Sequence, residues 1–355
     1  MAKKNLIVIG NGMVGHHFLE QFANTPAAAD YTIHVFGEEP LIAYDRVHLS
    51  EYFGGSTHAD LAMGTADQYM EKQIQLHLDE QVTDIDRDQR EVITPKGHYR
   101  YDAVVLATGS YPFVPPIQGN DQPHCLVYRT LADLDAIRAS SEGVKRGVVV
   151  GGGLLGLEAA NALKCLGLEA HVVEFAPRLM PVQLDSDGGT LLRRKIEELG
   201  VQVHTEKATT EIVPGDDHRL RMNFSDESHL ETDLIVFSAG IRPQDTLARS
   251  CGLEIGERGG IVIDDYCTTS DPQIFAIGEC ALWSNRIFGL VAPGYTMART
   301  ASARLNQDTE ASFVGADMST KLKLLGVDVG SIGDAHASTP GARNIRFNDE
   351  QAGTY

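Results

Sequence analysis

The apolar positions of this chain form short continuous runs that alternate with segments of helical periodicity. Residues 5–9 are one such run, and in residues 13–22 the apolar side chains recur at the spacing of a helix. Residues 147–150 and 157–166 repeat this arrangement. Strands that alternate with helices in this way predict an α/β protein with parallel sheets.

Each of these two runs enters its helix through a glycine-rich turn of the form G-x-G-x-x-G. In such a turn the first glycine makes the corner tight, the second lets the backbone approach a pyrophosphate, and the third lets helix and strand pack closely. The N–H groups at the helix start then bind phosphate. One such turn can be a plain strand–helix corner, whereas two in matching context predict two dinucleotide sites. The residues concerned are Gly10, Gly12, Met13 and Gly15 in the first turn, and Gly151, Gly153, Leu154, Leu155 and Gly156 in the second.

A site of this type also needs a carboxylate near the end of the next strand, where it binds a ribose hydroxyl. The second turn has Glu174 in that place. Because a carboxylate accepts the 2′-hydroxyl of NADH and repels the 2′-phosphate of NADPH, Glu174 favours NADH, unless the nearby Arg178 is free to offset it. In the first site Gly37 stands where an acid is common, so we expect Glu38 to bind the ribose, with Glu39 as the alternative.

The net charge of the chain excludes several kinds of partner. With 49 acidic residues against 30 lysines and arginines, the formal net charge is −19. Such a charge repels phosphates, so neither nucleic acid nor an anionic membrane surface is an expected partner. No apolar run approaches the roughly 20 residues of a membrane span. The length of 355 residues suits two or three domains.

The five cysteines are spaced irregularly, and none forms a C-x-x-C pair. An odd number without such pairs is typical of reduced thiols, which predicts a cytoplasmic protein without a disulfide framework. The thirteen histidines show no metal-ligand spacing, so no metal site is expected. The thiols, which we interpret as small buried side chains, are Cys125, Cys165, Cys251, Cys267 and Cys280.

Three further apolar runs end in short glycine corners, at Ala107-Thr108-Gly109, Ala239-Gly240 and Gly278-Glu279. Together with the paired turns, these corners resemble the FAD-dependent pyridine-nucleotide reductases over residues 1–305. The resemblance implies that FAD binds to the first turn and to the corners that begin at Ala107 and Gly278, with Glu279 on the ribityl chain. It implies that NAD(P)H binds to the second turn and to the corner that begins at Ala239.

The resemblance also implies an architecture. It is an α/β fold of two Rossmann-like, three-layer domains, the second inserted in the first, followed by a truncated C-terminal α+β domain. The FAD-binding domain would hold residues 1–117 and 246–308, and the NAD(H)-binding domain residues 118–245. Residues 309–355 would begin the last domain, with short strands at 322–325 and 327–329. Because this segment ends in polar residues without a recognisable ending, we expect the chain to be a fragment.

Four more residues are expected at these sites. Arg46 is the candidate for the FAD pyrophosphate, because a guanidinium pairs well with phosphate; the alternative is an ordinary surface arginine. Ser50 would bond the same phosphates or cap the next helix. By the resemblance, Val82 offers its backbone to the adenine, and a plain strand residue is the alternative. Glu158 would likewise lie beside the nicotinamide, and a solvated helix carboxylate is the alternative.

Segments 44–50, 277–281, 289–295 and 317–327 resemble, more narrowly, the large subunits of NADH-dependent nitrite reductases. In that group a flavin module feeds iron–sulfur and sirohaem domains of the same polypeptide. This chain shows no cysteine cluster for them after residue 280. The resemblance therefore implies an electron-input module with FAD and NADH as cofactors and those later domains as partners. It also leaves room for a small subunit and for an oligomer.

Two alternatives stay open. One is a stand-alone NADH-dependent ferredoxin or rubredoxin reductase, and the other is a flavoprotein that changes partners with its redox state. Glu51 stands where ferredoxin reductases usually carry a lysine, which weakens the first. Residues 44–53 contain no cysteine, so we expect no dithiol relay of the kind that disulfide reductases use. Electrons would then leave the flavin directly.

Overall fold

The computed structural model describes residues 3–324, 326–343, 345–347, 349 and 353–355. The chain folds into two compact units and passes between them several times. Among the described residues, no helix combines the length and the apolar character needed to cross a lipid bilayer. Unit 1 contains Met1–Arg46, Thr57–Tyr111 and Ile241–Met318, and unit 2 contains Val47–Ser56, Pro112–Gly240 and Ser319–Tyr355.

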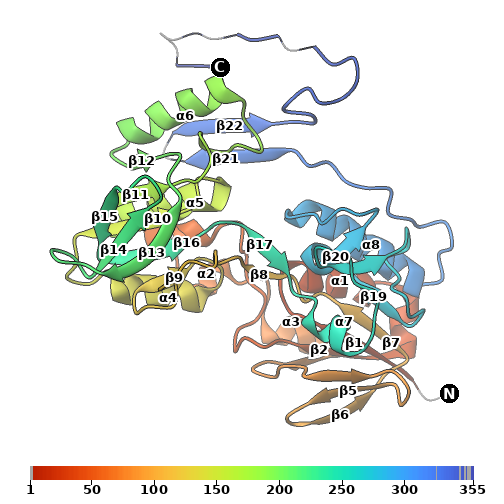
Figure 1. Cartoon of the computed structure of the whole chain (residues 1–355). Helices are drawn as coiled ribbons and strands as arrows, with labels where there is room; N and C mark the ends of the chain where they lie inside the picture. The colour runs from red at the N-terminus through yellow and green to blue at the C-terminus, as the bar shows by residue number, and fades with distance from the viewer. Residues whose placement is uncertain (1–2, 325, 344, 348, 350–352) are drawn as a thin grey trace. The chain divides into compact units, whose positions relative to one another are not determined.

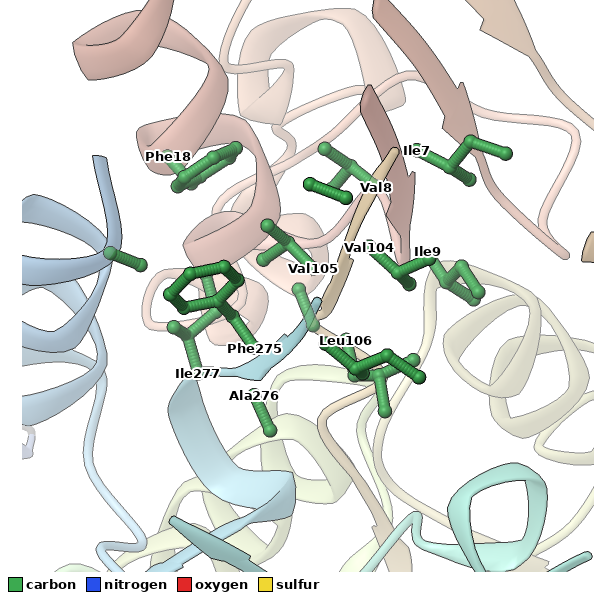
Figure 2. Close-up of a cluster of buried hydrophobic side chains, with 14 of the residues drawn as sticks. Ile7, Val8, Ile9, Phe18, Val104, Val105, Leu106, Phe275, Ala276 and Ile277 are labelled. Carbon is green, nitrogen blue, oxygen red and sulfur yellow. The ribbon is translucent and has the colours of Figure 1, made fainter. Parts of the chain in front are cut away.

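Unit 1 is built on a parallel sheet. Its strands are β1 (Lys4–Ile9), β2 (Tyr31–Phe36), β3 (Ile74–His77), β7 (Ala103–Leu106) and β19 (Ile274–Ala276). They lie in the order β19-β7-β1-β2-β3. Figure 1 labels β19, β7, β1 and β2 of this sheet. The inner part of β1 and the strands β7 and β19 are apolar because both faces of the middle of a parallel sheet are covered. Figure 2 shows Phe18 of helix α1 (Met13–Ala23) in one buried cluster with Val8, Val105 and Phe275 of the sheet.

The other elements of unit 1 are short, apart from helix α8 (Val291–Leu305), which packs against α1. An antiparallel sheet contains β4 (Asp84–Asp86), β5 (Glu91–Thr94) and β6 (Gly97–Arg100). The remaining strands are β8 (Ser110–Pro112), β17 (Ile241–Pro243), β18 (Ile261–Ile263) and β20 (Ala281–Trp283). The remaining helices are η1 (Pro26–Asp30), α2 (His58–Leu61), α3 (Ala66–Glu71), α7 (Thr246–Ser250) and η3 (Gly278–Cys280).

Unit 2 repeats the parallel arrangement, with its strands in the order β12-β11-β10-β16-β9. These are β9 (Cys125–Val127), β10 (Arg146–Val150), β11 (Glu169–Val173), β12 (Gln202–His204) and β16 (Leu234–Phe237). Helices α4 (Leu131–Ser140), α5 (Leu154–Cys165) and α6 (Ser186–Glu198) connect them. An antiparallel sheet of β13 (Thr209–Pro214), β14 (Leu220–Phe224) and β15 (His229–Thr232) packs on the parallel one, since Met222 and Phe224 share a buried cluster with Val148 and Phe237. Helix η2 (Leu49–Gly54) contacts α5.

The C-terminal part of the described chain contains one antiparallel hairpin, β21 (Thr320–Leu324) with β22 (Val327–Ser331). It falls on the two segments that were expected as short strands, of which Leu325 lies outside the described residues. This hairpin groups with unit 2, and residues 47–56 also belong there.

The parallel sheets confirm the predicted α/β class. The division into two compact units does not show which residues bind which cofactor. The bounds of the FAD-binding and NAD(H)-binding domains therefore remain a prediction.

Candidate dinucleotide-binding sites

The first glycine turn, between β1 and α1, has no room for side chains at two positions. Gly10 has φ +111°, and a Cβ there would lie 2.2 Å from the Ala107 carbonyl oxygen. A Cβ at Gly15 would lie 2.1 Å from the carbonyl oxygen of Gly10. Because both obstacles are backbone atoms, no rotamer change relieves them. Strand, turn and helix are therefore held together by the absence of two side chains.

At Gly12, the second glycine of this turn, the reason for a glycine is different. A Cβ on Gly12 would meet nothing within 4 Å. Gly12 is the N-cap of α1, and it carries no side chain that could bond the N–H groups of the first helical turn. An open surface beside such N–H groups suits a phosphate. Met13, expected at this site, is the first residue of the helix.

The acids expected at the first site differ in their surroundings. Glu38 is exposed, and its Oε2 accepts a 3.4 Å hydrogen bond from Gln81. Glu39 is partly buried and accepts a 2.8 Å hydrogen bond from the Tyr44 hydroxyl. The Arg46 guanidinium forms an ion pair with Glu39 and lies 5.0 Å from the centre of the Tyr44 ring. The structure thus brings Arg46 and Glu39 together, although the sequence suggested separate tasks for them.

The corner after β7 closes against a distant segment of the same unit. The Thr108 hydroxyl donates to the Gln244 carbonyl at 2.6 Å, and the Gln244 N–H donates to the Gly109 carbonyl at 2.9 Å. Gly109 has φ +69°, which favours glycine. Ala107, before them, is buried against the first glycine turn. The corner therefore shapes the floor of the first site.

The second corner of unit 1 lies after β19. Gly278 has φ +81°, and a Cβ there would press on the Val14 side chain of α1 at 3.3 Å. Glu279 is partly buried, and its Oε2 accepts a 2.7 Å hydrogen bond from the Ser110 hydroxyl. This carboxylate is thus aligned at the end of a strand two places from β1 in the sheet.

Val82 and Ser50, the other two residues expected at the FAD, belong to different units. Val82 has a buried side chain in the extended segment between β3 and β4, in unit 1. Ser50 lies in η2, which belongs to unit 2. The structure therefore does not bring Ser50 into the same unit as Arg46, and its role stays a prediction.

The second glycine turn, between β10 and α5, has the same construction in unit 2. Gly151 has φ +120°, and its Cβ would lie 2.3 Å from the Ser238 carbonyl oxygen. A Cβ at Gly156 would lie 1.9 Å from the carbonyl oxygen of Gly151. Gly153 is the N-cap of α5, without a side-chain cap and with open space beside it. Leu154 and Leu155, expected at this site, begin the helix, and Leu155 is exposed.

Glu174, directly after β11, holds this turn with both carboxylate oxygens. Its Oε2 accepts from the Gly152 N–H at 2.5 Å, and its Oε1 accepts from the Ala176 N–H at 2.7 Å. The Nε of Arg178 donates to the Leu184 carbonyl at 3.0 Å, so this part of the guanidinium is engaged by the local loop. The carboxylate is therefore fixed at the helix start.

The corner after β16 borders this turn as well, because Ser238 packs against Gly151. Ala239 is partly buried, and Gly240 is exposed with φ +108°. The Gly240 carbonyl accepts a 2.9 Å hydrogen bond from the Phe113 N–H.

Glu158 lies on α5, and burial raises the pKa of its carboxyl to about 7, against a smaller opposing effect of His48. Burial of Tyr128 and, to a smaller extent, the negative charge of Glu158 raise the pKa of the Tyr128 hydroxyl. That hydroxyl is buried and has no hydrogen-bond partner among the described residues. Sequence reasoning missed Tyr128, which has no local signal beyond an apolar setting. It could have found His48, which lies in the segment 44–50 that carried the narrower resemblance.

All five cysteines are free thiols. Cys267 and Cys280 are buried, and burial raises the pKa of both thiols, which makes them poor nucleophiles at neutral pH. Cys165, by contrast, is exposed, so the expectation of buried thiols is wrong for it. Among the described residues, no group of three or more His, Cys, Asp and Glu side chains could hold a metal ion.

Comparisons with known proteins agree with this geometry. A family model described as pyridine nucleotide-disulphide oxidoreductase matches residues 4–304. The chain is 59% identical over 348 residues to the nitrite reductase (NAD(P)H) large subunit of Klebsiella oxytoca, an alignment that covers 98% of this chain and 36% of that protein. It is 55% identical to the nitrite reductase (NADH) large subunit of Escherichia coli K12, with 100% and 42% covered. The chain therefore spans less than half the length of these relatives.

Among solved structures, the ferredoxin reductase from Rhodopseudomonas palustris superposes with a TM-score of 0.85 at 26% identity. That match covers 94% of this chain and 83% of the other.

Proposed function

The chain belongs to the pyridine nucleotide-disulphide oxidoreductase family, and from that membership we propose that it transfers a hydride from NADH to FAD as the electron-input module of an NADH-dependent nitrite reductase. Membership makes the chain an oxidoreductase and implies FAD and NAD(P)H as cofactors. The observation that carries the proposal is the pair of uncapped helix starts with open glycines, one in each unit. The identity with two nitrite reductase large subunits supports the choice of reaction for the whole protein.

The first turn fits FAD in shape and charge. The open side of Gly12 would let a pyrophosphate reach the N–H groups of α1. Arg46 can keep its ion pair with Glu39 and still bind a phosphate, because a guanidinium has five N–H donors. Glu38 is exposed and so free to reach a ribose hydroxyl. Glu279, aligned by Ser110, would accept from the ribityl hydroxyls. Bound FAD would supply the hydride acceptor and would release its electrons singly.

The second turn fits NADH. Glu174 spends one lone pair of each oxygen on the backbone, so each oxygen can still accept a ribose hydroxyl. Its charge would oppose the 2′-phosphate of NADPH. The Nε of Arg178 donates to the Leu184 carbonyl, which ties one edge of this guanidinium to the local loop. We therefore propose NADH as the preferred donor.

We propose that Glu158 positions the nicotinamide. Because its pKa is raised to about 7, its neutral and ionised forms both occur near neutral pH. The neutral carboxyl can donate to the carboxamide oxygen of the nicotinamide, and the ionised form can accept from the carboxamide nitrogen. The charge of Glu158 acts on the buried Tyr128 hydroxyl, which has no hydrogen-bond partner among the described residues and so could donate to a bound nicotinamide.

The partners follow from the proposed reaction. We propose that the electrons pass to iron–sulfur and sirohaem domains of the same polypeptide, with a small subunit as a further partner. The five free thiols support a reducing compartment and hence the cytoplasm.

A stand-alone ferredoxin reductase is the second candidate, because the similarity to a solved ferredoxin reductase covers 83% of that chain.

The test uses the FAD-loaded chain with NADH and three acceptors. We expect rapid reduction of ferricyanide, no ammonium from nitrite, and slow reduction of a purified ferredoxin. That ferricyanide activity should survive replacement of each cysteine by serine. Ammonium formed by this chain alone would contradict the module proposal, and fast turnover with ferredoxin would favour the second candidate. A chain that takes up no FAD in equilibrium dialysis would overturn both.

A further inference from the structure

Phe175, the residue after Glu174, presents its ring to solvent at the carboxyl end of the unit 2 sheet. Its side chain is 78% exposed. An exposed phenylalanine leaves apolar surface in water that burial would normally remove. The exposed ring of Phe175 is therefore a candidate to be covered by a bound ligand.

The exposure of Phe175 is fixed by its neighbours. The Glu174 N–H donates to the His204 carbonyl at 2.8 Å, and the Lys207 N–H donates to the Glu174 carbonyl at 3.1 Å. The Ala176 N–H is held by the Glu174 carboxylate, and the Ala176 carbonyl accepts from the Glu206 N–H at 3.1 Å. Both residues that flank Phe175 are thus bonded on two sides, and the backbone carries the ring in a set place.

That place is defined by the chemistry of the adjacent acid. In a dinucleotide, the ribose carbon that carries the 2′-hydroxyl is bonded directly to the carbon that carries the adenine. An acid that binds this hydroxyl therefore has the base within reach of its next residue. We propose that Phe175 is the platform on which the adenine ring of NADH stacks. This inference rests on the proposed function of the second turn.

The equivalent position in unit 1 is Glu38, because Ile9 pairs with Phe36 as Val150 pairs with Val173. The same backbone location thus carries a charged side chain in one unit and an aromatic ring in the other. The fold therefore does not account for an aromatic residue at this place. An aromatic face suits any base and adds affinity without reading its edge.

The test measures ADP-ribose binding to the FAD-loaded chain by calorimetry. We expect Phe175→Ala to weaken ADP-ribose by about tenfold, the size of one lost base–aromatic stack, and Phe175→Tyr to restore most of it. Val314→Ala, which trims a side chain that is 84% exposed in unit 1, is the matched control and should leave affinity unchanged. Reduction of the flavin by reduced nicotinamide mononucleotide, which has no adenine, should not respond to Phe175→Ala.

Equal ADP-ribose affinity in Phe175→Ala and the parent chain would overturn the inference and leave the proposed function intact. An equal loss with the mononucleotide would also overturn it, because the substitution would then act on the whole site. If the parent chain itself does not bind ADP-ribose, the proposed function fails, and this inference fails with it.

Discussion

The glycine turn of unit 1 and that of unit 2 have the same strand register but exchange a large and a small residue. In unit 2, Gly152 follows the first glycine, and a Cβ there would lie 3.0 Å from the Oε2 of Glu174. In unit 1, Asn11 occupies the place of Gly152, and Gly37 the place of Glu174. A Cβ on Gly37 would lie 3.3 Å from the Cβ of Asn11. The space between the glycine turn and the strand end is thus filled by Glu174, from the strand end, in unit 2. In unit 1 it is filled by Asn11, from the turn.

The difference indicates that a carboxylate fits at the end of the strand only when the residue of the glycine turn beside it has no side chain. Asn11 fills that room in unit 1, where its Oδ1 accepts a 2.9 Å hydrogen bond from Tyr69. We therefore expect the acid of the first site to come from beyond the strand, from Glu38 or Glu39. The two turns share their geometry, and we propose that they differ in how they bind a ribose.

The largest effect is expected when the second turn is given the residue of the first. Gly152→Asn would crowd Glu174 and the Leu179 side chain, whose Cδ2 would lie 2.6 Å from the new Cβ. We expect the free energy of unfolding to fall by about 3 kcal/mol. NADH affinity should fall more than tenfold, because Glu174 loses its bond to the turn. Urea unfolding and NADH titration measure the two effects.

The double variant Gly152→Asn with Glu174→Gly rebuilds the pair found in unit 1 and serves as the control. It should regain most of the lost stability but not the preference for NADH. A single variant as stable as the parent, or a double variant no better than the single one, would break the comparison.

The second-largest effect is expected when the Glu174 carboxylate is removed. Glu174→Ala should narrow the preference for NADH over NADPH by about tenfold, because a charge-assisted hydrogen bond contributes roughly 1.5–3 kcal/mol. Glu39→Ala, in unit 1, should weaken the binding of FAD but leave the preference for NADH over NADPH unchanged. Stopped-flow rates with both donors provide the measurement, and a parent chain that reacts faster with NADPH would disprove the assignment.

A third prediction compares the same helix position in the two units, Glu158 on α5 and His17 on α1. Burial raises the pKa of Glu158 to about 7 and lowers the pKa of His17. At both positions burial therefore disfavours the charged form of the side chain. Between the unfolded pKa of a glutamate and pH 7, the folded chain holds a proton that the unfolded chain has lost. Glu158 therefore makes the chain less stable as the pH rises through that window.

The variant Glu158→Gln removes this cost. It should match the parent at low pH and exceed its free energy of unfolding by about 3 kcal/mol at pH 8. Urea unfolding at both pH values measures the difference. Identical pH profiles for variant and parent would show that the Glu158 carboxyl is not perturbed by folding.

The smallest effect is expected for Asn11→Gly, which empties the contested space of unit 1. The loss of the Tyr69 hydrogen bond should lower stability by about 1 kcal/mol. The ratio of NADH to NADPH rates should not change. A loss of stability as large as that expected for Gly152→Asn would contradict the idea that Asn11 in unit 1 and Glu174 in unit 2 fill the same space.

The features that depend on local sequence were predictable. The apolar runs, the glycine spacing and Glu174 indicated two nucleotide-type turns in an α/β fold, and the parallel sheets of both units agree. The exchange between Asn11 and Gly37 was not predictable, because it depends on which residues the strand register sets side by side. The pair of Glu158 and Tyr128 was hidden for the same reason, since α5 and the segment after β9 meet only in the folded unit.

We propose that one turn holds the donor and the other the acceptor of the same hydride. The direct measurement is anaerobic stopped-flow mixing of the FAD-loaded chain with NADH, observed by the loss of flavin absorbance. It is repeated with NADH that carries deuterium at the transferred position. We predict complete bleaching of the flavin, slowed by the deuterium. A flavin that stays oxidised, although FAD is bound and NADH is in excess, would contradict the account.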